Sequence, residues 1–393
     1  MVQAQVMAGL VCLGFYMTSM TSISAWKEIG WEPWRIGVAT TTVNLAYAFM
    51  VALGGRLADR WGRARTGLAG AAAGIGGCVT ALFLPQPWSA LTAFFCVNAA
   101  GAFCFPALAG LVSDSGAGER GPAMPLHRKV SGYNIGWSGG ELVGFAVFGL
   151  LAAMPRRTGF ASASVVFVIL AAWFASRRGM KAKVHKEAGD RTSRPGLPLL
   201  TFMGRFNLLL ACVLGSGMVS QLEKSFGTAV GLEEARRLTS VLMTCYAAGL
   251  VCSFVALGRW DGWVFRPRRL ALLQLGLPLG GAGLVLLGRA GLANPEALAA
   301  CGLAMGASFG AVYTGSLYYS LRLPSRAGAS AGVHETFIGT GNVIGPFLAG
   351  VFLQFREMPD GWGLGGLGEF ICAVSLAGVL FQSILIPRVE RRF

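Results

Sequence analysis

The sequence contains few charged residues, and it is poorest in acids and histidine. Only 13% of its 393 residues are Asp, Glu, Lys or Arg, with 18 acidic residues and 3 histidines, while 54% are hydrophobic. A chain of this length and composition does not have enough polar residues to cover soluble domains. These shortages exclude an ordinary soluble protein, and we expect an integral membrane protein.

The sequence also has no cysteine pair or histidine cluster that indicates a bound metal. Its 9 cysteines are scattered through hydrophobic runs, none in a Cys-x-x-Cys pair, and no His-x-x-x-His sequence occurs. Scattered, buried thiols in odd number argue against disulfides and against a metal site. No nucleophile–base pair or phosphate-binding loop suggests an enzyme. We therefore expect a protein that is not an enzyme and has no cofactor.

Hydrophobic runs long enough to cross a bilayer recur along the whole chain. About 20 residues of helix span the ~30 Å of hydrocarbon in a membrane. The runs cover residues 5–26, 34–55, 66–85, 88–113, 127–153, 158–176, 199–223, 237–258, 269–288, 295–320, 330–355 and 365–387. The predicted fold is therefore an all-α polytopic membrane protein with 12 transmembrane helices.

The basic residues are unevenly distributed between the loops. The net charge of +15 would suggest nucleic-acid binding in a soluble protein. Here most of the 33 Lys and Arg residues lie in alternate loops, those after the even-numbered runs, and in the C-terminal tail. This is the positive-inside pattern. We expect a multi-pass protein of the cytoplasmic (inner) membrane, with the lipid bilayer as partner, both termini cytoplasmic and no nucleic-acid partner.

The chain divides into two halves of six runs each. We predict an N-terminal six-helix bundle over residues 1–177, a basic cytoplasmic linker over 178–198 and a C-terminal six-helix bundle over 199–393. A basic segment after the second run, residues 55–65, has a weaker copy after the eighth, residues 258–269. Two six-helix halves of related sequence are typical of transporters.

Residues 55–65 carry the most specific motif of the chain. They read Gly55-Arg56-Leu57-Ala58-Asp59-Arg60-Trp61-Gly62-Arg63-Ala64-Arg65, and five ionisable side chains place them in a loop at the membrane surface. The segment resembles the loop 2–3 signature of the major facilitator superfamily (MFS), and the resemblance extends over essentially the whole chain. It implies two pseudo-symmetric bundles around a central cavity, which rock between inward-open and outward-open states.

The resemblance also implies a cytoplasmic gate. In the family, the loop acid matched by Asp59 faces the start of the eleventh helix, where a carboxylate gains from the helix dipole. The loop arginines pair with an acid that ends the fourth helix, here Asp114. The candidate gate residues are Gly55, Asp59, Arg60, Gly62, Arg63, Arg65, Asp114 and, in the second copy, Asp261. The alternative is that these charges only anchor the loop.

Two carboxylates, Glu141 and Glu335, are expected to be the only ones well inside the hydrophobic runs. An ionisable group within a membrane indicates function by default. Glu141 shares a polar stripe with Asn134 and Trp137 at helical spacing, beside a seam of glycines at every fourth residue from Gly132. We predict that Glu141 binds and releases a proton or pairs with a cationic substrate. A protonated glutamate bonded to a neighbouring helix is the alternative.

Glu335 and His334 lie little more than one turn inside the eleventh run. Glu335 shares a helix face with Asn342, and its depth suggests a cytoplasmic gate. His334 and Glu335 are further candidates for proton coupling, because imidazole titrates near neutral pH. The equal alternative is that His334 and Glu335 have no role in coupling and find their hydrogen-bond partners at the membrane interface, where the helix begins.

The remaining candidates for the lining of the cavity are uncharged. They are Tyr16, Asn44, Tyr47, Asn98, Asn134, Trp137, Gln221, Tyr246, Tyr313 and Asn342. No Lys or Arg lies deep in a predicted run, so an anionic substrate would find no buried counter-charge. We therefore expect a neutral or cationic small-molecule substrate.

Together these features predict a secondary active transporter, an antiporter for proton-coupled efflux of a small organic solute, acting as a monomer. One alternative is an uptake symporter or uniporter for a sugar-like or amphipathic solute. The other is a non-transporting receptor or scaffold of the same fold. The arginine and glutamine that many proton antiporters of the family carry in the fourth helix are replaced by Val97 and Ala100.

Overall fold

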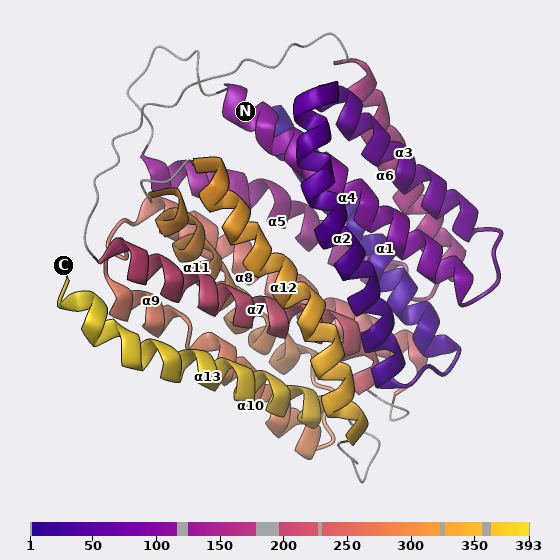
Figure 1. Cartoon of the computed structure of the whole chain (residues 1–393). Coiled ribbons are helices and arrows are strands. Elements are labelled where there is room, and N and C mark those ends of the chain that lie inside the picture. The colour runs from indigo at the N-terminus through magenta and orange to yellow at the C-terminus, as the bar shows by residue number, and fades with distance from the viewer. Residues whose placement is uncertain are drawn as a thin grey trace.

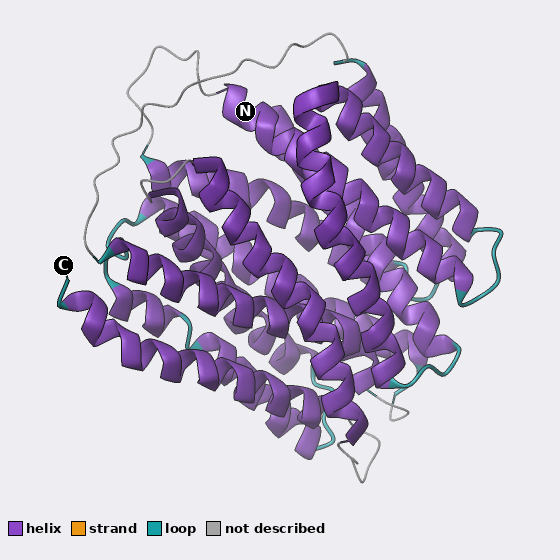
Figure 2. Cartoon of the chain, in the orientation of Figure 1, coloured by secondary structure: helices purple, strands orange, loops and turns teal. Residues whose placement is uncertain are grey.

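The computed structural model describes residues 2–115, 125–177, 196–226, 230–322, 327–355 and 363–392, which are helical with short connections and contain no strand (Figure 2). Most of the predicted linker 178–198 lies outside the described residues. The side chains of Asp59 and Asp114 lie outside them as well.

The described part of the chain forms thirteen helices, which make twelve passes because α9 and α10 together form one. The first six are α1 (Val2–Glu28), α2 (Pro33–Trp61), α3 (Arg63–Ala81), α4 (Trp88–Ser115), α5 (Leu126–Leu150) and α6 (Arg156–Ala175). The others are α7 (Leu197–Ser225), α8 (Leu232–Arg259), α9 (Pro267–Leu273), α10 (Gly276–Arg289), α11 (Pro295–Arg322), α12 (Ala327–Phe355) and α13 (Leu364–Glu390). The predicted all-α fold with twelve spans is confirmed.

Ten of the passes are long and apolar enough to cross a membrane by composition alone. The other two, α3 and α5, have the length but are diluted by glycine and polar residues. Large apolar side chains cover the outside of the molecule, including Phe83 at 81% and Leu150 at 79% exposure. Such a surface is stable only against lipid, and helices satisfy every backbone hydrogen bond there.

The helices gather into two groups that meet along a shared face. In Figure 1, α1–α4 and α6 occupy the upper right and α7–α13 the lower left, while α5 lies left of the other first-half helices, above α8. One buried core is built only from residues 4–174 and another only from residues 197–389. Between the groups, α2 packs on α12 and α5 packs on α8.

The α5–α8 contact is held by hydrogen bonds far apart along both helices. The Ser131 hydroxyl donates to the Phe254 carbonyl at 2.5 Å, and the Ser240 hydroxyl donates to the Phe145 carbonyl at 2.7 Å. The paired positions run in opposite directions, so the helices are antiparallel. About 14 residues, or ~21 Å of helix, separate the two bonds along α5.

The predicted loop at residues 55–65 is wrong in its secondary structure. Helix α2 continues to Trp61, α3 begins at Arg63, and Gly62 alone separates them. Alanine, leucine and arginine favour helix, and Arg56, Arg60 and Arg65 are exposed, so α2 extends beyond the hydrophobic run. Gly62 has φ +90°, a conformation that only glycine adopts readily. The motif is therefore a tight corner between two helices.

The predicted glycine seam on α5 is confirmed, and it packs against α1. A Cβ atom at Gly140 would lie 1.8 Å from the carbonyl oxygen of Gly9, and one at Gly136 would lie 3.0 Å from that of Gln5. The two backbones therefore touch, which small residues alone permit. This contact fixes how α5 is rotated, and with it the direction of Glu141.

Replacing Gly140 by alanine should destabilise the protein strongly. The new methyl group meets backbone rather than a movable side chain, so we expect a loss of about 3 kcal/mol, at the upper end for an overpacked core. Thermal unfolding in detergent measures the effect. Gly139→Ala is the matched control, because a Cβ there has no neighbour within 4 Å. Equal melting temperatures for the two variants would contradict the seam.

Candidate functional site

Glu141 lies inside the contact between the two groups of helices. Its side chain is buried, with 4% of its surface exposed. The hydroxyl of Tyr16 on α1 lies within reach of its carboxyl, and Tyr246 on α8 is close enough to interact with its charge. The structure thus brings three predicted residues together, from α1, α5 and α8.

Glu335 is exposed, although it lies in a helix that spans the membrane. Tyr47 on α2, Tyr133 on α5 and Tyr313 on α11 are close enough to interact with its charge. Side chains from both groups of helices therefore approach it. We infer that the exposed surface of Glu335 faces the space between the groups rather than lipid.

A row of aromatic rings connects the surroundings of the two carboxylates. This aromatic row consists of Tyr246, Phe309, Tyr313, Trp137 and Phe254. Ring centroids lie 5.8 Å apart for Tyr246 and Phe309, 6.5 Å for Phe309 and Tyr313, and 5.3 Å for Tyr313 and Trp137. The Phe254 ring packs edge-on against Trp137 and Tyr313. These rings come from α5, α8 and α11.

His334 and Glu335 are adjacent in sequence but lie in different surroundings. The His334 ring is completely buried, its Nδ1 is 3.1 Å from the Ser316 hydroxyl, and it packs edge-on against Tyr313. Its Nε2 has no hydrogen-bond partner among the described residues. Within the described part of the chain no hydrogen bond joins His334 to Glu335, so the direct proton relay between them stays a prediction.

A cluster of charged residues closes the molecule at the end where α1 finishes. This sealing cluster consists of Ser24, Lys27 and Glu28 of α1, Glu223 of α7 and Arg236 of α8. The Arg236 Nε donates to the Ser24 hydroxyl at 2.6 Å, which donates to Glu223 Oε1 at 2.9 Å. Lys27 donates to the Glu223 carbonyl at 2.7 Å, and Arg236 also forms an ion pair with Glu28.

The centre of the sealing cluster is removed from water, while Lys27 is partly buried and Glu28 is exposed at its edge. Glu223 is 1% exposed and Arg236 is 8% exposed. Arg236 also donates to the Ala152 carbonyl at 3.2 Å, and Arg156 pairs with Glu28 at 2.5 Å. Because its members come from both groups of helices, the cluster holds the two groups together at this end.

Glu223 is a further buried carboxylate, which lies two residues before the end of α7 at Ser225. Ser24 and Lys27 of α1 contact this last turn of α7 and enclose Glu223. The signal that could have revealed it is the repeat of the two halves. An acid–lysine neighbour pair ends the first run at Lys27 and Glu28, and a second ends the seventh run at Glu223 and Lys224.

The candidate gate residues lie at the opposite end of the helices. Gly55 and Arg63 are partly buried, Arg60 and Arg65 are exposed, and Asp261 is exposed after the end of α8. The pairing proposed for Asp59 and Asp114 concerns side chains outside the described residues. That gate therefore stays a prediction.

The other candidate residues divide between the cavity and the packing around it. The Asn44 amide donates to the Asn342 carbonyl at 2.7 Å, joining α2 to α12, and Trp137 donates to Asn134 at 3.4 Å. Asn98 instead donates to the Phe94 carbonyl of its own helix. Gln221 donates to the Pro33 carbonyl at 3.1 Å, beside the sealed end.

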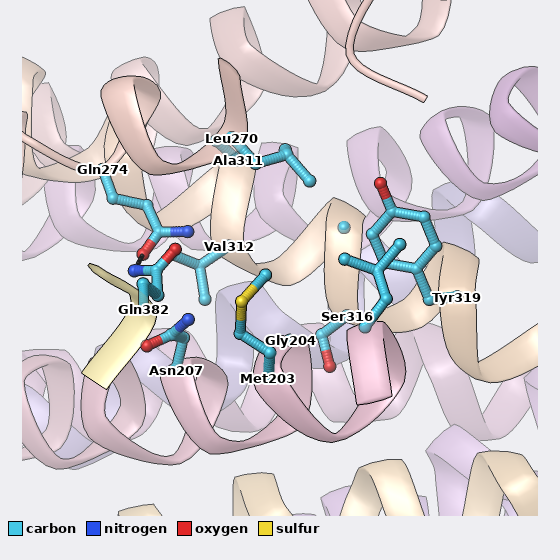
Figure 3. Close-up of a pocket in the computed structure, with 12 residues that line it drawn as sticks. Met203, Gly204, Asn207, Leu270, Gln274, Ala311, Val312, Ser316, Tyr319 and Gln382 are labelled. Atoms are coloured by element: carbon cyan, nitrogen blue, oxygen red, sulfur yellow. Dashed lines mark hydrogen bonds between the residues drawn. The ribbon is translucent and has the colours of Figure 1, made fainter. Parts of the chain in front are cut away.

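A separate small pocket lies within the second group of helices (Figure 3). Asn207, Gln274 and Gln382 meet there, and Gln382 Nε2 donates to Gln274 Oε1 at 2.5 Å. The side-chain oxygens of Asn207 and Gln382 have no partner among the described residues. Sequence reasoning missed these amides because each occurs singly in a hydrophobic run.

These features define the class of the protein. A helical membrane protein with twelve passes, internal carboxylates between two groups of helices and one sealed end has the architecture of a membrane transporter. A family model of the Major Facilitator Superfamily matches residues 6–346. The chain belongs to this family, and it is a secondary transporter with a small-molecule substrate rather than an enzyme.

Solved structures of the same fold cover nearly the whole chain. The nucleoside transporter NupG superposes with a TM-score of 0.68 at 13% identity, covering 98% of both chains. A bacterial homolog of the human lysosomal transporter Spinster, in an inward-facing and occupied conformation, has a TM-score of 0.64 at 15% identity, covering 99% of this chain and 96% of its own. A search of curated protein sequences found no match.

Proposed function

We propose that this protein exports a small neutral or cationic organic compound across the cytoplasmic membrane in exchange for protons. The observation that carries the proposal is Glu141, a carboxyl buried where α1, α5 and α8 meet. Both termini are placed in the cytoplasm by the distribution of basic residues, and the transporter acts as a monomer.

Burial gives Glu141 the chemistry of a coupling site. Burying an ionised carboxylate away from water has a high free-energy cost. The Glu141 carboxyl therefore keeps its proton while it is enclosed. When the groups of helices separate and water reaches it, the proton can leave. Because Tyr16 and Tyr246 come from opposite groups, the surroundings of Glu141 change with every transport cycle.

Alternating access requires two gates that open in turn. The sealing cluster closes the end where α1 finishes, which the basic-residue pattern makes the external end. The motif at residues 55–65, with Asp114, forms the cytoplasmic gate that the family resemblance implies. Residues 1–177 and 199–393 then rock as two bundles about their shared face.

An uptake symporter or uniporter is the second candidate for this cavity. Because NupG, which shares this fold, is a nucleoside transporter, nucleosides are the first compounds to test in that class, beside sugars and amphipathic solutes. A receptor or scaffold of the same fold would need no gates.

Transport into proteoliposomes under an imposed pH gradient tests the proposal. The panel contains organic cations, nucleosides, sugars and amphiphiles, with protein-free vesicles as the control. Uphill movement of a neutral or cationic compound against the proton flow is the expected result. Movement in the same direction as protons would establish the symporter, and no flux across the panel would favour a receptor.

Asp59→Asn should leave the protein folded and reduce turnover by about tenfold or more. The substitution keeps the shape of the side chain and removes the charge that the family resemblance implies at a helix N-terminus, an interaction worth up to ~2 kcal/mol in favourable geometry. Initial rates in the same vesicles, normalised to the amount of reconstituted protein, measure the effect. An Asp59→Asn variant that transports as fast as wild type would contradict the cytoplasmic gate.

A further inference from the structure

We propose that Glu335, with Tyr47, Tyr133 and Tyr313, binds the cationic group of a monovalent organic cation. The inference rests on the proposed transport function and names the substrate class within it. It assigns different roles to the two carboxylates, since Glu141 carries the proton and Glu335 receives the substrate.

The first argument is the position of Glu335 on α12. Gly339, one turn further along, packs against Ala48, where a Cβ would lie 3.7 Å away. Asn342, two turns along, accepts a hydrogen bond from Asn44. Residues spaced by four and seven lie on one helix face, so Glu335 lies on the face of α12 that approaches α2. Ala48, which Gly339 approaches, directly follows Tyr47 in α2.

The second argument is that Glu335 has no cation of its own. Within the described residues no ion pair or hydrogen bond is formed by its carboxylate. Arg205 interacts with the neighbouring His334 and donates to the Ser320 hydroxyl at 3.0 Å. An unpaired carboxylate in a cavity with low-dielectric walls concentrates a negative potential, which attracts a positive ligand and repels an anion.

The third argument is the chemistry of the walls. The three tyrosines come from α2, α5 and α11, so they approach Glu335 from different sides. Aromatic faces attract cations, quaternary ammonium groups included. A carboxylate combined with several such rings satisfies both the charge and the apolar surface of an organic cation.

Glu141 does not offer the same site. Its side chain is 4% exposed and is enclosed by Tyr16 and neighbouring helices, so a bulky ion has no access to it in this conformation. A proton needs no such space. The difference in exposure between the two carboxylates is the reason for dividing the roles.

The inference is tested by measuring how tightly ethidium binds to the purified protein in detergent. Fluorescence polarisation of ethidium reports binding, and tetraphenylphosphonium serves as the competitor. We expect Glu335→Gln to weaken binding about tenfold or more and Glu335→Asp to keep most of it. Tyr47→Ala should weaken binding several-fold, and Tyr47→Phe should retain it because the ring face remains. Glu296→Gln is the control, since Glu296 is exposed at the start of α11.

Wild-type affinity in Glu335→Gln would overturn the assignment, as would failure of the wild type to bind either cation. A folded state is checked for each variant by its melting temperature and by a single gel-filtration peak. The binding assay needs no pH gradient, so its failure is separate from failure of the proposed export. Proton-driven flux of a neutral compound together with no cation binding would keep the transport function and reject this site.

Discussion

Glu141→Gln should abolish the coupling of transport to a pH gradient while leaving substrate exchange intact. Glutamine has the shape of a protonated glutamate, so it fits the space beside Tyr16 without burying a charge. It cannot release a proton when the cavity opens. We expect uphill transport driven by the gradient to fall to the level of protein-free vesicles, about tenfold or more below wild type.

Two assays on the same vesicles separate coupling from binding. Substrate counterflow without a pH gradient involves no net proton movement and should continue in Glu141→Gln. Glu296→Gln, an exposed glutamate distant from the cavity, serves as the control and should behave as wild type. Identical pH dependence in Glu141→Gln and wild type would exclude Glu141 as the coupling site.

Arg236→Gln should destabilise the sealed end and shift the protein toward the state in which that end is open. The substitution leaves Glu28 and Glu223 without their shared cation, and Glu223 is 1% exposed. Removing one partner of a buried ion pair costs about 3–5 kcal/mol. Since each 1.4 kcal/mol is tenfold, the ratio of sealed to open protein should fall about 100-fold or more.

Hydrogen–deuterium exchange measures this shift without added labels. Backbone amides near residues 24–28 and 232–236 should exchange faster in Arg236→Gln. Arg237→Gln is the matched control, because Arg237 is exposed and pairs at 3.1 Å with Glu234 on its own helix. Adding Glu223→Gln to Arg236→Gln should restore part of the protection, since it removes the unpaired buried charge. Unchanged exchange in Arg236→Gln would rule out the sealing cluster as a gate.

The hydrophobic runs predicted the fold because a bilayer imposes one length on every helix that crosses it. Residue pattern alone therefore gave twelve passes, and the glycine spacing on α5 predicted a close contact with another helix, which the structure identifies as α1. Helix ends were less predictable, because α2 continues past its hydrophobic run into a segment whose charges indicate the membrane surface. That extension is why the segment 55–65 is helical on both sides of Gly62.

The candidate site was predictable where an ionisable residue occurs within a hydrophobic run. Glu141 and Glu335 stood out for this reason. Tyr133 did not, since a tyrosine in a hydrophobic run is common and its position beside Glu335 depends on how α5 and α12 pack. Arg236 and Glu28 were also missed, because their pairing joins residues that are 208 positions apart.

The two serine bonds between α5 and α8 determine where the largest movements should occur. A pair of helices fastened at points ~21 Å apart along α5 resists separation at either end. We therefore expect the two halves of the transporter to rotate about the α5–α8 contact. We expect the other contact between the halves, where α2 meets α12, to open further than the α5–α8 contact in each cycle. Amphipathic compounds dissolved in the membrane would meet the widening seam between those two helices first.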